Sequence, residues 1–340
     1  MPTFPLCVEA LDFASADVAA GNKAAAGKPG SFAAIGTFNP AIEIFDLDVL
    51  EVLEPDVVLG GPLKASASGR RRNGAVAGFK EGSHTGAIMA LSWNHEFRNL
   101  LASGSADGTA KIWDLATQQC RRTFQHHKNK VQSVVWNPAE QNILATGSFD
   151  RTIATLDART PGRGARFKLP SDIEDLKWNP YAPFQFVAAC EDGTLLSHDI
   201  RKPQAPLFCF KAHKKAVSAI SFSQYVPGLL ATCSTDMSVK IFDLLHASQL
   251  TGVKTATGKV NAPTLVVSKT MNVGPLFSVE FFPGQPFLLA TAGELGMVAV
   301  WETTEESYVS RCFSGARVRE APPVYPNSSK ASTPTTSQRQ

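Results

Sequence analysis

Long apolar runs are absent from this chain of 340 residues. No stretch approaches the roughly eighteen apolar residues that a membrane-spanning helix requires. The N-terminus also lacks the basic segment followed by an apolar segment that marks a secretory signal. We therefore expect a soluble protein that is not secreted and does not bind a membrane. Its composition, 44% hydrophobic and 19% charged, is typical of a globular chain and excludes wholesale disorder.

Closely spaced cysteines are absent as well. None of the six cysteines belongs to a CxxC pair or lies at the spacing of a metal site. Several stand in apolar surroundings, as in Phe208-Cys209-Phe210, which predicts buried, reduced thiols of an intracellular protein. The six are Cys7, Cys120, Cys190, Cys209, Cys233 and Cys312.

Catalytic and cofactor-binding motifs are missing too. The sequence contains no glycine-rich phosphate loop, HExxH motif, nucleophile elbow or pair of catalytic carboxylates. Gly60-Gly61 opens a linker without a clear change from strand to helix, so it is a weak nucleotide signal. We expect a protein that is not an enzyme and uses no cofactor, no metal and no small-molecule substrate.

What the chain does contain is an internal repeat of about forty to forty-five residues. An aromatic residue opens each of four units, an aspartate follows fourteen positions later, and a strand ending in aspartate closes the unit six positions beyond. The aromatic residues are Trp93, Trp136, Trp178 and Phe222, and the aspartates after them are Asp107, Asp150, Asp192 and Asp236. Divergent units end at Ile44-Phe45-Asp46 and at Val300-Trp301-Glu302.

Each unit is built from short apolar runs separated by Gly, Asn, Asp and Pro. One unit predicts strands at 87–93, 100–103, 109–113 and 120–124, with a tight turn at Asp107-Gly108. No segment of the repeat region has a sustained apolar period near 3.6 residues. Four strands per unit without helices predict an all-β protein, a β-propeller of six recognisable blades with an incomplete seventh as an open alternative.

These features resemble the WD repeat over residues 6–303: a leading His84, the Asp107-Gly108 turn and the Trp113-Asp114 strand ending. Within that group the chain is similar to the periodic tryptophan protein 1 family. Family members carry an additional acidic N-terminal region, so the sequence leaves open whether six blades close the ring or a seventh comes from other residues. The stretches that carry this narrower resemblance are 7–13, 42–48, 53–60, 90–103 and 131–133.

The resemblance implies a function. It implies a non-enzymatic scaffold of the nucleolus and nucleus that acts in large ribosomal subunit biogenesis and rRNA processing. Its partners would be assembly proteins of the large-subunit precursor and pre-rRNA. The alternative is a propeller that binds histones or chromatin and influences rRNA transcription. A third hypothesis, a substrate adaptor for a ubiquitin ligase, has no specific residue to support it.

His84, Ser103 and Asp107 have the residue types of a hydrolase triad. The same set recurs at equal offsets, whereas an enzyme needs one such site, so the repetition favours architecture over catalysis. The WD resemblance implies a buried hydrogen-bonded chain from Asp through His and Ser or Thr to Trp. The residues expected in this network are His84, Ser103, Asp107, Trp113, His127, Thr146, Asp150, His213, Thr232, Asp236 and Trp301.

Some units have an incomplete set. Leu156 and Phe242 replace the tryptophan, so these two blades are expected to lose the last link of the network. The fourth unit has Leu169 and His198 at the histidine and tryptophan positions. In the last unit Asn272, Thr291 and Leu295 stand where His, Ser or Thr, and Asp are expected. These blades are expected to depend more on apolar packing.

Positive charge is concentrated in segments that break the repeat, although the net charge is only +3. We expect a propeller over 1–313 with a basic flexible insertion at 60–83 and an inter-blade insertion at 247–270, followed by a disordered Ser/Thr/Pro-rich basic tail at 314–340. Such segments suit phosphate backbones, although solubilising linkers have similar compositions. The candidate RNA contacts are Lys64, Arg70, Arg71, Arg72, Lys80, Arg317 and Arg319.

Overall fold

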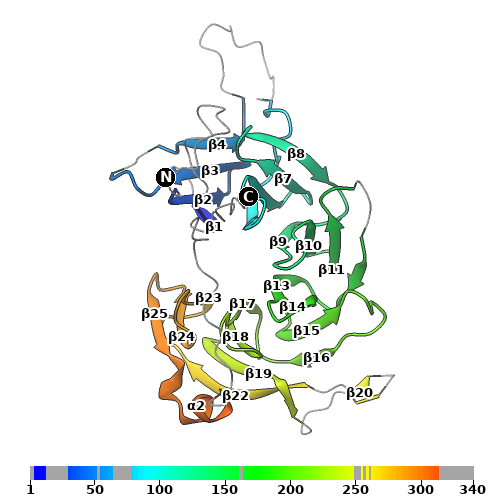
Figure 1. Cartoon of the computed structure of the whole chain (residues 1–340), viewed down its shortest axis with the longest axis vertical. Coiled ribbons are helices and arrows are strands. Elements are labelled where there is room, and N and C mark those ends of the chain that lie inside the picture. The colour runs from blue at the N-terminus through cyan, green and yellow to red at the C-terminus, as the bar shows by residue number, and fades with distance from the viewer. Residues whose placement is uncertain are drawn as a thin grey trace, which may run out of the picture.

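The chain folds as a β-propeller. The computed structural model describes residues 4–12, 30–51, 54–63, 78–160, 164–248, 254–255, 258–259 and 262–313. In these residues six antiparallel sheets, the blades, follow one another around a central axis (Figure 1). The all-β propeller with six recognisable blades is therefore confirmed.

Each blade is a run of strands joined to their neighbours in sequence order. Blade 1 contains β1 (Pro5–Leu11), β2 (Phe32–Thr37), β3 (Ala41–Asp46) and β4 (Val57–Gly60). Blade 2 contains β5 (Ile88–Trp93), β6 (Leu100–Ser105), β7 (Ala110–Asp114) and β8 (Gln119–Phe124). Blade 3 contains β9 (Val131–Trp136), β10 (Ile143–Ser148), β11 (Thr152–Asp157) and β12 (Arg166–Lys168).

The second half of the ring is less regular. Blade 4 contains β13 (Ile173–Asn179), β14 (Ala182–Cys190), β15 (Thr194–Asp199) and β16 (Phe208–Lys211). Blade 5 contains β17 (Val217–Phe222), β18 (Leu229–Ser234), β19 (Ser238–Ser248) and β22 (Ala262–Thr270). Blade 6 has three strands, β23 (Leu276–Phe281), β24 (Leu288–Gly293) and β25 (Val298–Glu302), after which come η1 (Thr303–Glu305) and α2 (Ser307–Phe313).

The turns between the second and third strands use left-handed backbone at corresponding positions. Gly108 (φ 79°) and Gly193 (φ 89°) follow the landmark aspartates of blades 2 and 4. Arg151 (φ 62°) and Met237 (φ 69°) take the same place in blades 3 and 5, at the modest steric cost of a side chain in this conformation. A Cβ at Gly108 would lie 3.3 Å from the carbonyl oxygen of Asn129, so this turn packs closely on the next blade.

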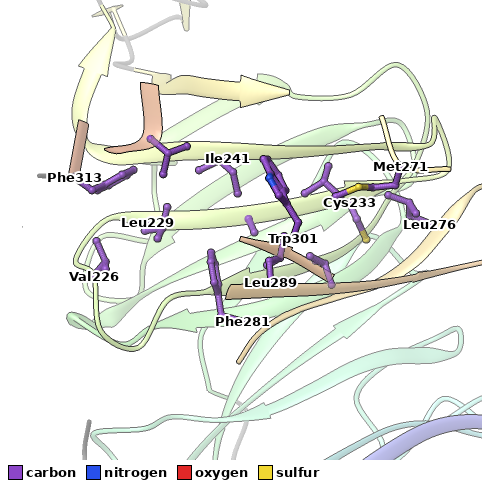
Figure 2. Close-up of a cluster of buried hydrophobic side chains, with 14 of the residues drawn as sticks. Val226, Leu229, Cys233, Ile241, Met271, Leu276, Phe281, Leu289, Trp301 and Phe313 are labelled. Carbon is purple, nitrogen blue, oxygen red and sulfur yellow. The ribbon is translucent and has the colours of Figure 1, made fainter. Parts of the chain in front are cut away.

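The hydrophobic core lies between the blades. Five clusters of buried side chains fill the five spaces between consecutive sheets. Figure 2 shows the cluster between blades 5 and 6, where Ile241 of β19 and Trp301 of β25 meet beside Leu289 of β24. Phe313 of α2 also joins this cluster, so the helix closes its outer end.

The segment 247–270 differs from the expected inter-blade insertion. Residues 262–270 form β22, which pairs with β19 as the fourth strand of blade 5. Between them β20 (Lys254–Thr255) and β21 (Gly258–Lys259) pair in a sheet of their own. The fourth strand was missed because an unusually long connection delays it, although the β-branched Val266 and Val267 favour a strand.

Both ends of the basic insertion expected at 60–83, residues 60–63 and 78–83, belong to the described propeller. Pro62 pairs with Phe79, and the Ser83 hydroxyl donates to the Gly61 carbonyl oxygen at 3.3 Å, so both ends of the segment are held against the propeller. Residues 64–77 and the tail 314–340 lie outside the described residues.

The thiols are less buried than expected. Cys190 and Cys233 are buried, but Cys7, Cys120 and Cys209 are partly exposed, and Cys312 is exposed on α2. The prediction was wrong for Cys312 because a short amphipathic helix, which the strand pattern did not indicate, turns it towards solvent. Among the described residues no helix is both long and apolar enough to cross a bilayer.

The inter-blade clusters predict large costs for truncation. Leu144 is fully buried between blades 2 and 3. Replacing Leu144 by alanine is expected to lower the free energy of unfolding by about 3 kcal/mol, because a cavity remains. Chemical denaturation measures this. Leu50→Ala, at a side chain 89% exposed, is the control and should change stability by less than about 0.5 kcal/mol. Equal losses would contradict a core between the blades.

Candidate functional site

The His-Ser-Asp set of blade 2 forms a buried chain of hydrogen bonds. The Trp113 indole N–H donates to Ser103 Oγ at 2.8 Å, and Ser103 Oγ lies 2.7 Å from His84 Nε2. His84 Nδ1 lies 3.1 Å from Asp107 Oδ2. Because a carboxylate can only accept, His84 carries its proton on Nδ1 and Nε2 accepts from the serine hydroxyl. The buried side-chain nitrogen and oxygen atoms that form these hydrogen bonds are therefore all paired.

The aspartate ties two loops together. Asp107 accepts the backbone N–H of Thr85 and that of Thr109, each at 2.9 Å. It thus fixes the loop entering blade 2 against its turn. Burial on its own would raise the pKa of Asp107, but hydrogen bonds from His84 and Thr109 hold it well below its ordinary value. Burial lowers the pKa of His84, so the imidazole stays neutral.

In blade 3 a second histidine takes the place of the missing indole. Thr146 Oγ1 lies 2.9 Å from His127 Nε2 and also 2.9 Å from His126 Nε2. His127 in turn lies 3.0 Å from Asp150. The expectation that this blade loses its last link is therefore wrong, because His126 reaches the hydroxyl from the position before His127. The adjacent pair of histidines was the available signal.

Blade 5 keeps the histidine and aspartate but has no indole. His213 Nε2 lies 2.8 Å from Thr232 Oγ1, and His213 Nδ1 lies 3.2 Å from Asp236 Oδ2. Phe242 fills the tryptophan position with a buried ring. Burial lowers the pKa of His213 to about 4. Burial alone would raise the pKa of Asp236, but hydrogen bonds from Ser238 and Lys214 hold it at about 2.

Trp301 and His198 do not join such a chain. The Trp301 indole nitrogen is buried without a hydrogen-bond partner among the described residues, and Thr291 instead donates to the Ser278 carbonyl oxygen at 2.9 Å. Trp301 was expected in the network, but without a histidine in blade 6 its hydroxyl partner turns to the backbone. His198 packs against the ring of Phe167, with a centroid distance of 4.9 Å.

The buried set does not offer a nucleophile to a substrate. A pocket of about 390 Å³ opens beside Asp107, but fully buried His84 and Ser103 do not line it. Among the described residues no group of three or more His, Cys, Asp or Glu could hold a metal ion. The side chains around the pocket are Ser83, Thr85, Asp107, Gly108, Thr109, Lys111, Gln125 and His127.

Charged side chains on the innermost strands escaped the sequence analysis. Asp175 of β13 accepts a hydrogen bond from Ser133 of blade 3 at 3.3 Å and from the Ile220 N–H of blade 5 at 3.0 Å. Burial would lower the pKa of Lys177, but Asp175, Glu280 and Glu9 together hold it above its ordinary value. Carboxylates of blades 1, 4 and 6 thus act on one ammonium near the axis.

Of the candidate RNA contacts, the structure describes only Lys80. Its Nζ lies 3.5 Å from the Val58 carbonyl oxygen, and the side chain is exposed. The other six lie outside the described residues: Lys64, Arg70, Arg71, Arg72, Arg317 and Arg319.

Two loops that enter blades form a basic rim. Lys128 and Lys214 directly follow the network histidines of blades 3 and 5, and their backbone N–H groups donate to Asp150 and Asp236. The aspartates therefore fix both loops while the lysine side chains stay exposed. Lys215 is exposed beside Lys214. The network thus presents lysines at one edge of the ring.

Comparison with known proteins agrees with this geometry. The family described as WD domain, G-beta repeat matches residues 79–114, 118–154 and 204–243. An uncharacterized WD repeat-containing protein of Schizosaccharomyces pombe is 36% identical over 322 residues, which cover 94% of this chain and 58% of that protein.

Two further relatives carry the name periodic tryptophan protein 1. The periodic tryptophan protein 1 homolog of Drosophila melanogaster is 30% identical over 86% of this chain and 58% of its own length. Periodic tryptophan protein 1 of Saccharomyces cerevisiae is 30% identical over 83% of this chain and 49% of its own length. The chain thus spans about half to three fifths of these curated relatives.

The network of blade 2 predicts a stability defect. Ser103→Ala leaves His84 Nε2 and the Trp113 indole without their partner, so we expect a loss of about 2 kcal/mol, measured by urea denaturation. Trp113→Phe removes the indole donor but leaves the hydrogen bond between Ser103 and His84. Its loss of stability therefore measures the contribution of the indole hydrogen bond alone. A normal free energy of unfolding for Ser103→Ala would contradict the structural role.

The depressed histidine pKa predicts acid sensitivity. In the folded protein His213 titrates at about 4, against an ordinary value of 6.5, so the folded state binds fewer protons between these pH values. This contribution to stability is complete above pH 6.5 and is lost as the pH falls towards 4. Urea denaturation at pH 7.5, 6 and 5 measures the loss. His213→Asn introduces the residue type found at the corresponding position of blade 6 and removes the titrating group. This variant should lose less stability than the wild type between pH 7.5 and 5, and an equal loss would refute the assignment of the acid sensitivity to His213.

Proposed function

This chain is a WD-repeat β-propeller protein similar to periodic tryptophan protein 1 over most of its length, and we propose that it is a non-enzymatic scaffold in assembly of the large ribosomal subunit. In this proposal it works in the nucleolus, binds assembly proteins of the precursor particle through the rims of the ring, and contacts pre-rRNA through basic segments. The proposal rests on one observation above all. His84 and Ser103, which have the residue types of a catalytic triad, are buried and hydrogen-bonded to each other inside blade 2. Function is therefore expected on the surface, through binding.

The rim with exposed lysines supports a macromolecular partner. Lys128, Lys214 and Lys215 lie on loops that the network aspartates hold in place, so binding costs little conformational entropy of these loops. Several arginines of the blades already form ion pairs. Arg201 forms an ion pair with Asp199 at 2.6 Å, and Arg151 forms one with Asp172 at 3.0 Å. Exposed pairs of this kind are weak and can exchange for phosphate groups.

The place from which the basic insertion leaves the propeller supports an RNA contact. The described chain stops at Leu63 and resumes at Gly78, and the paired Pro62 and Phe79 hold these two points together at the outer edge of blade 1. Arg70, Arg71 and Arg72 belong to the intervening residues, so their attachment point is fixed on the outside of the ring. Arginine near the surface contacts phosphate without needing a base sequence.

The experiment compares wild-type protein with two triple variants. Arg70→Ala with Arg71→Ala and Arg72→Ala should weaken pre-rRNA binding and reduce the slope of log K against log salt by about 2, at roughly 0.7 per phosphate contact. The matched control removes the same charge from exposed blade residues, as Lys168→Ala, Lys202→Ala and Lys211→Ala. Its slope should change less, and equal changes would contradict a specific contact.

Recovery from nuclear extract tests the wider proposal. Tagged wild-type protein should recover large-subunit precursor rRNA and assembly proteins, and ribonuclease should release the RNA but keep the directly bound proteins. Failure to recover either would refute the scaffold function. Histone recovery that ribonuclease leaves intact would favour the chromatin alternative.

A further inference from the structure

A polar pocket lies on the rim of blade 2. Its volume is about 390 Å³, and four parts of the chain line it. They are the loop that enters blade 2, the turn between β6 and β7, the strand β7, and the segment that leads from β8 to blade 3. The network aspartates fix both loops, since Asp107 accepts the Thr85 N–H and Asp150 accepts the Lys128 N–H. The walls of this pocket are therefore largely preformed.

Lys111 of β7 brings a buried positive charge to the pocket. It lines the pocket and is only 5% exposed. Its ammonium donates to Thr123 Oγ1 at 2.8 Å, and among the described residues no carboxylate forms an ion pair with it. An ammonium has three N–H donors, so two of them remain for another partner. Burial of a charge without a counter-charge is unfavourable, and an anion in the pocket would relieve that cost.

The corresponding lysine of blade 5 has a different arrangement. Lys111 pairs in register with Ser103, and Lys240 pairs with Thr232, so each lysine stands opposite the network hydroxyl of its blade. Lys240 donates to the carbonyl oxygen of Ala212, the residue before the network histidine, at 2.6 Å. Lys111 instead reaches a hydroxyl of the outer strand β8. The same residue type at the same position is thus held by the backbone in one blade and lines a pocket in the other.

The negative charge at the pocket already has its partners. Among the described residues that line the pocket, Asp107 is the one carboxylate. Its Oδ1 accepts from the Thr109 N–H at 2.9 Å and from the Thr109 hydroxyl at 2.6 Å. Its Oδ2 accepts from the Thr85 N–H at 2.9 Å and from His84 Nδ1 at 3.1 Å. None of these donors is Lys111, so the charge of this lysine is left for a ligand.

The other side chains at the pocket suit a phosphate group. Thr85 and Gln125 carry a hydroxyl and an amide that can donate to phosphate oxygens, and Lys128 is exposed next to the lining residue His127. The described lining residues include no Phe, Tyr or Trp on which a nucleobase could stack. Because Lys111 is almost fully buried, its partner must project into the wall. A phosphate monoester at the end of a side chain can do so, whereas a phosphate of a nucleic acid backbone carries a sugar on each side.

We propose that this pocket binds the phosphate of a phosphorylated serine or threonine side chain on a partner protein. In this proposal the Lys111 ammonium keeps its hydrogen bond to Thr123 and donates its two remaining N–H groups to phosphate oxygens. The side chains of Thr85 and Gln125 add neutral donors. Hydrogen bonds between an ammonium and a phosphate are charge-assisted and stronger than neutral ones. The inference does not depend on the RNA contact proposed above, which concerns residues outside this pocket.

The test titrates a phosphopeptide into the whole chain. The probe is a blocked pentapeptide with phosphoserine between two glycines on each side, and the same peptide with serine is its control. Nuclear magnetic resonance of ¹⁵N-labelled protein follows the backbone amides of Gly108 and Lys111. The phosphopeptide should shift both amides until they saturate, and the serine peptide should leave them unchanged. Lys111→Met keeps the apolar stem but removes the ammonium, and it should weaken binding by about tenfold or more.

Blade 5 provides the matched control. Lys240→Met removes a lysine at the corresponding position, away from the pocket, and should bind the phosphopeptide as the wild type does. Urea denaturation with and without the phosphopeptide separates binding from folding. The phosphopeptide should stabilise the wild type and Lys240→Met, because it binds the folded state, but should not stabilise Lys111→Met. Equal affinity of Lys111→Met and the wild type would overturn the proposal.

Other ligands have distinct outcomes. Inorganic phosphate that shifts the two amides while the phosphopeptide does not would overturn the proposal in favour of a free anion. A uridine oligonucleotide without terminal phosphates that shifts them and binds more tightly than the phosphopeptide would overturn it in favour of an RNA backbone. Recovery of precursor rRNA from nuclear extract tests the proposed function separately, so failure of one proposal is distinguishable from failure of the other.

Discussion

Stacking of sheets with two apolar faces is the constraint on which the molecule depends. A blade of about forty residues is too small to bury a core of its own, so each must share its side chains with a neighbour. The clusters between the sheets, and not those within a blade, are accordingly where Leu144, Ile241 and Leu289 are buried. Turns, loops and the buried polar network then serve to keep the sheets at the distance and angle that this stacking requires.

The polar network solves a problem that stacking creates. Loops that enter each blade are drawn inward, and their N–H groups need partners. In blade 2 a single aspartate accepts one N–H of the entering loop and one of the turn, and it orients a neutral histidine, which reaches a hydroxyl deep between the strands. In blades 3 and 5 the same geometry fixes the loops that carry Lys128 and Lys214 and leaves these lysine side chains in solvent. The aspartates that pair the buried backbone groups therefore also hold the exposed lysines in place.

Much of this was predictable because it is periodic. The spacing from Trp93 to Asp107, repeated along the chain, led to the blades, and the recurrence of His84 with Ser103 pointed to architecture over catalysis. Substitutions inside the pattern were harder to interpret. His126 replaces an indole from the loop that enters blade 3, and Trp301 keeps its residue type while losing its partner. Long-range contacts such as Asp175 with Ile220 leave no local signal, and the long hairpin before β22 concealed a strand.

The open ring has a consequence for how the described residues come apart. A closed circle has no ends, whereas among the described residues blades 1 and 6 each share a buried apolar cluster with one neighbour only, so the stacked sheets form a linear array with two ends. In such an array stability is a sum of nearest-neighbour couplings, and the terminal units are held by one coupling instead of two. Fraying therefore begins at the first and last sheets and travels inward, while blades 3 and 4 form the segment that melts last.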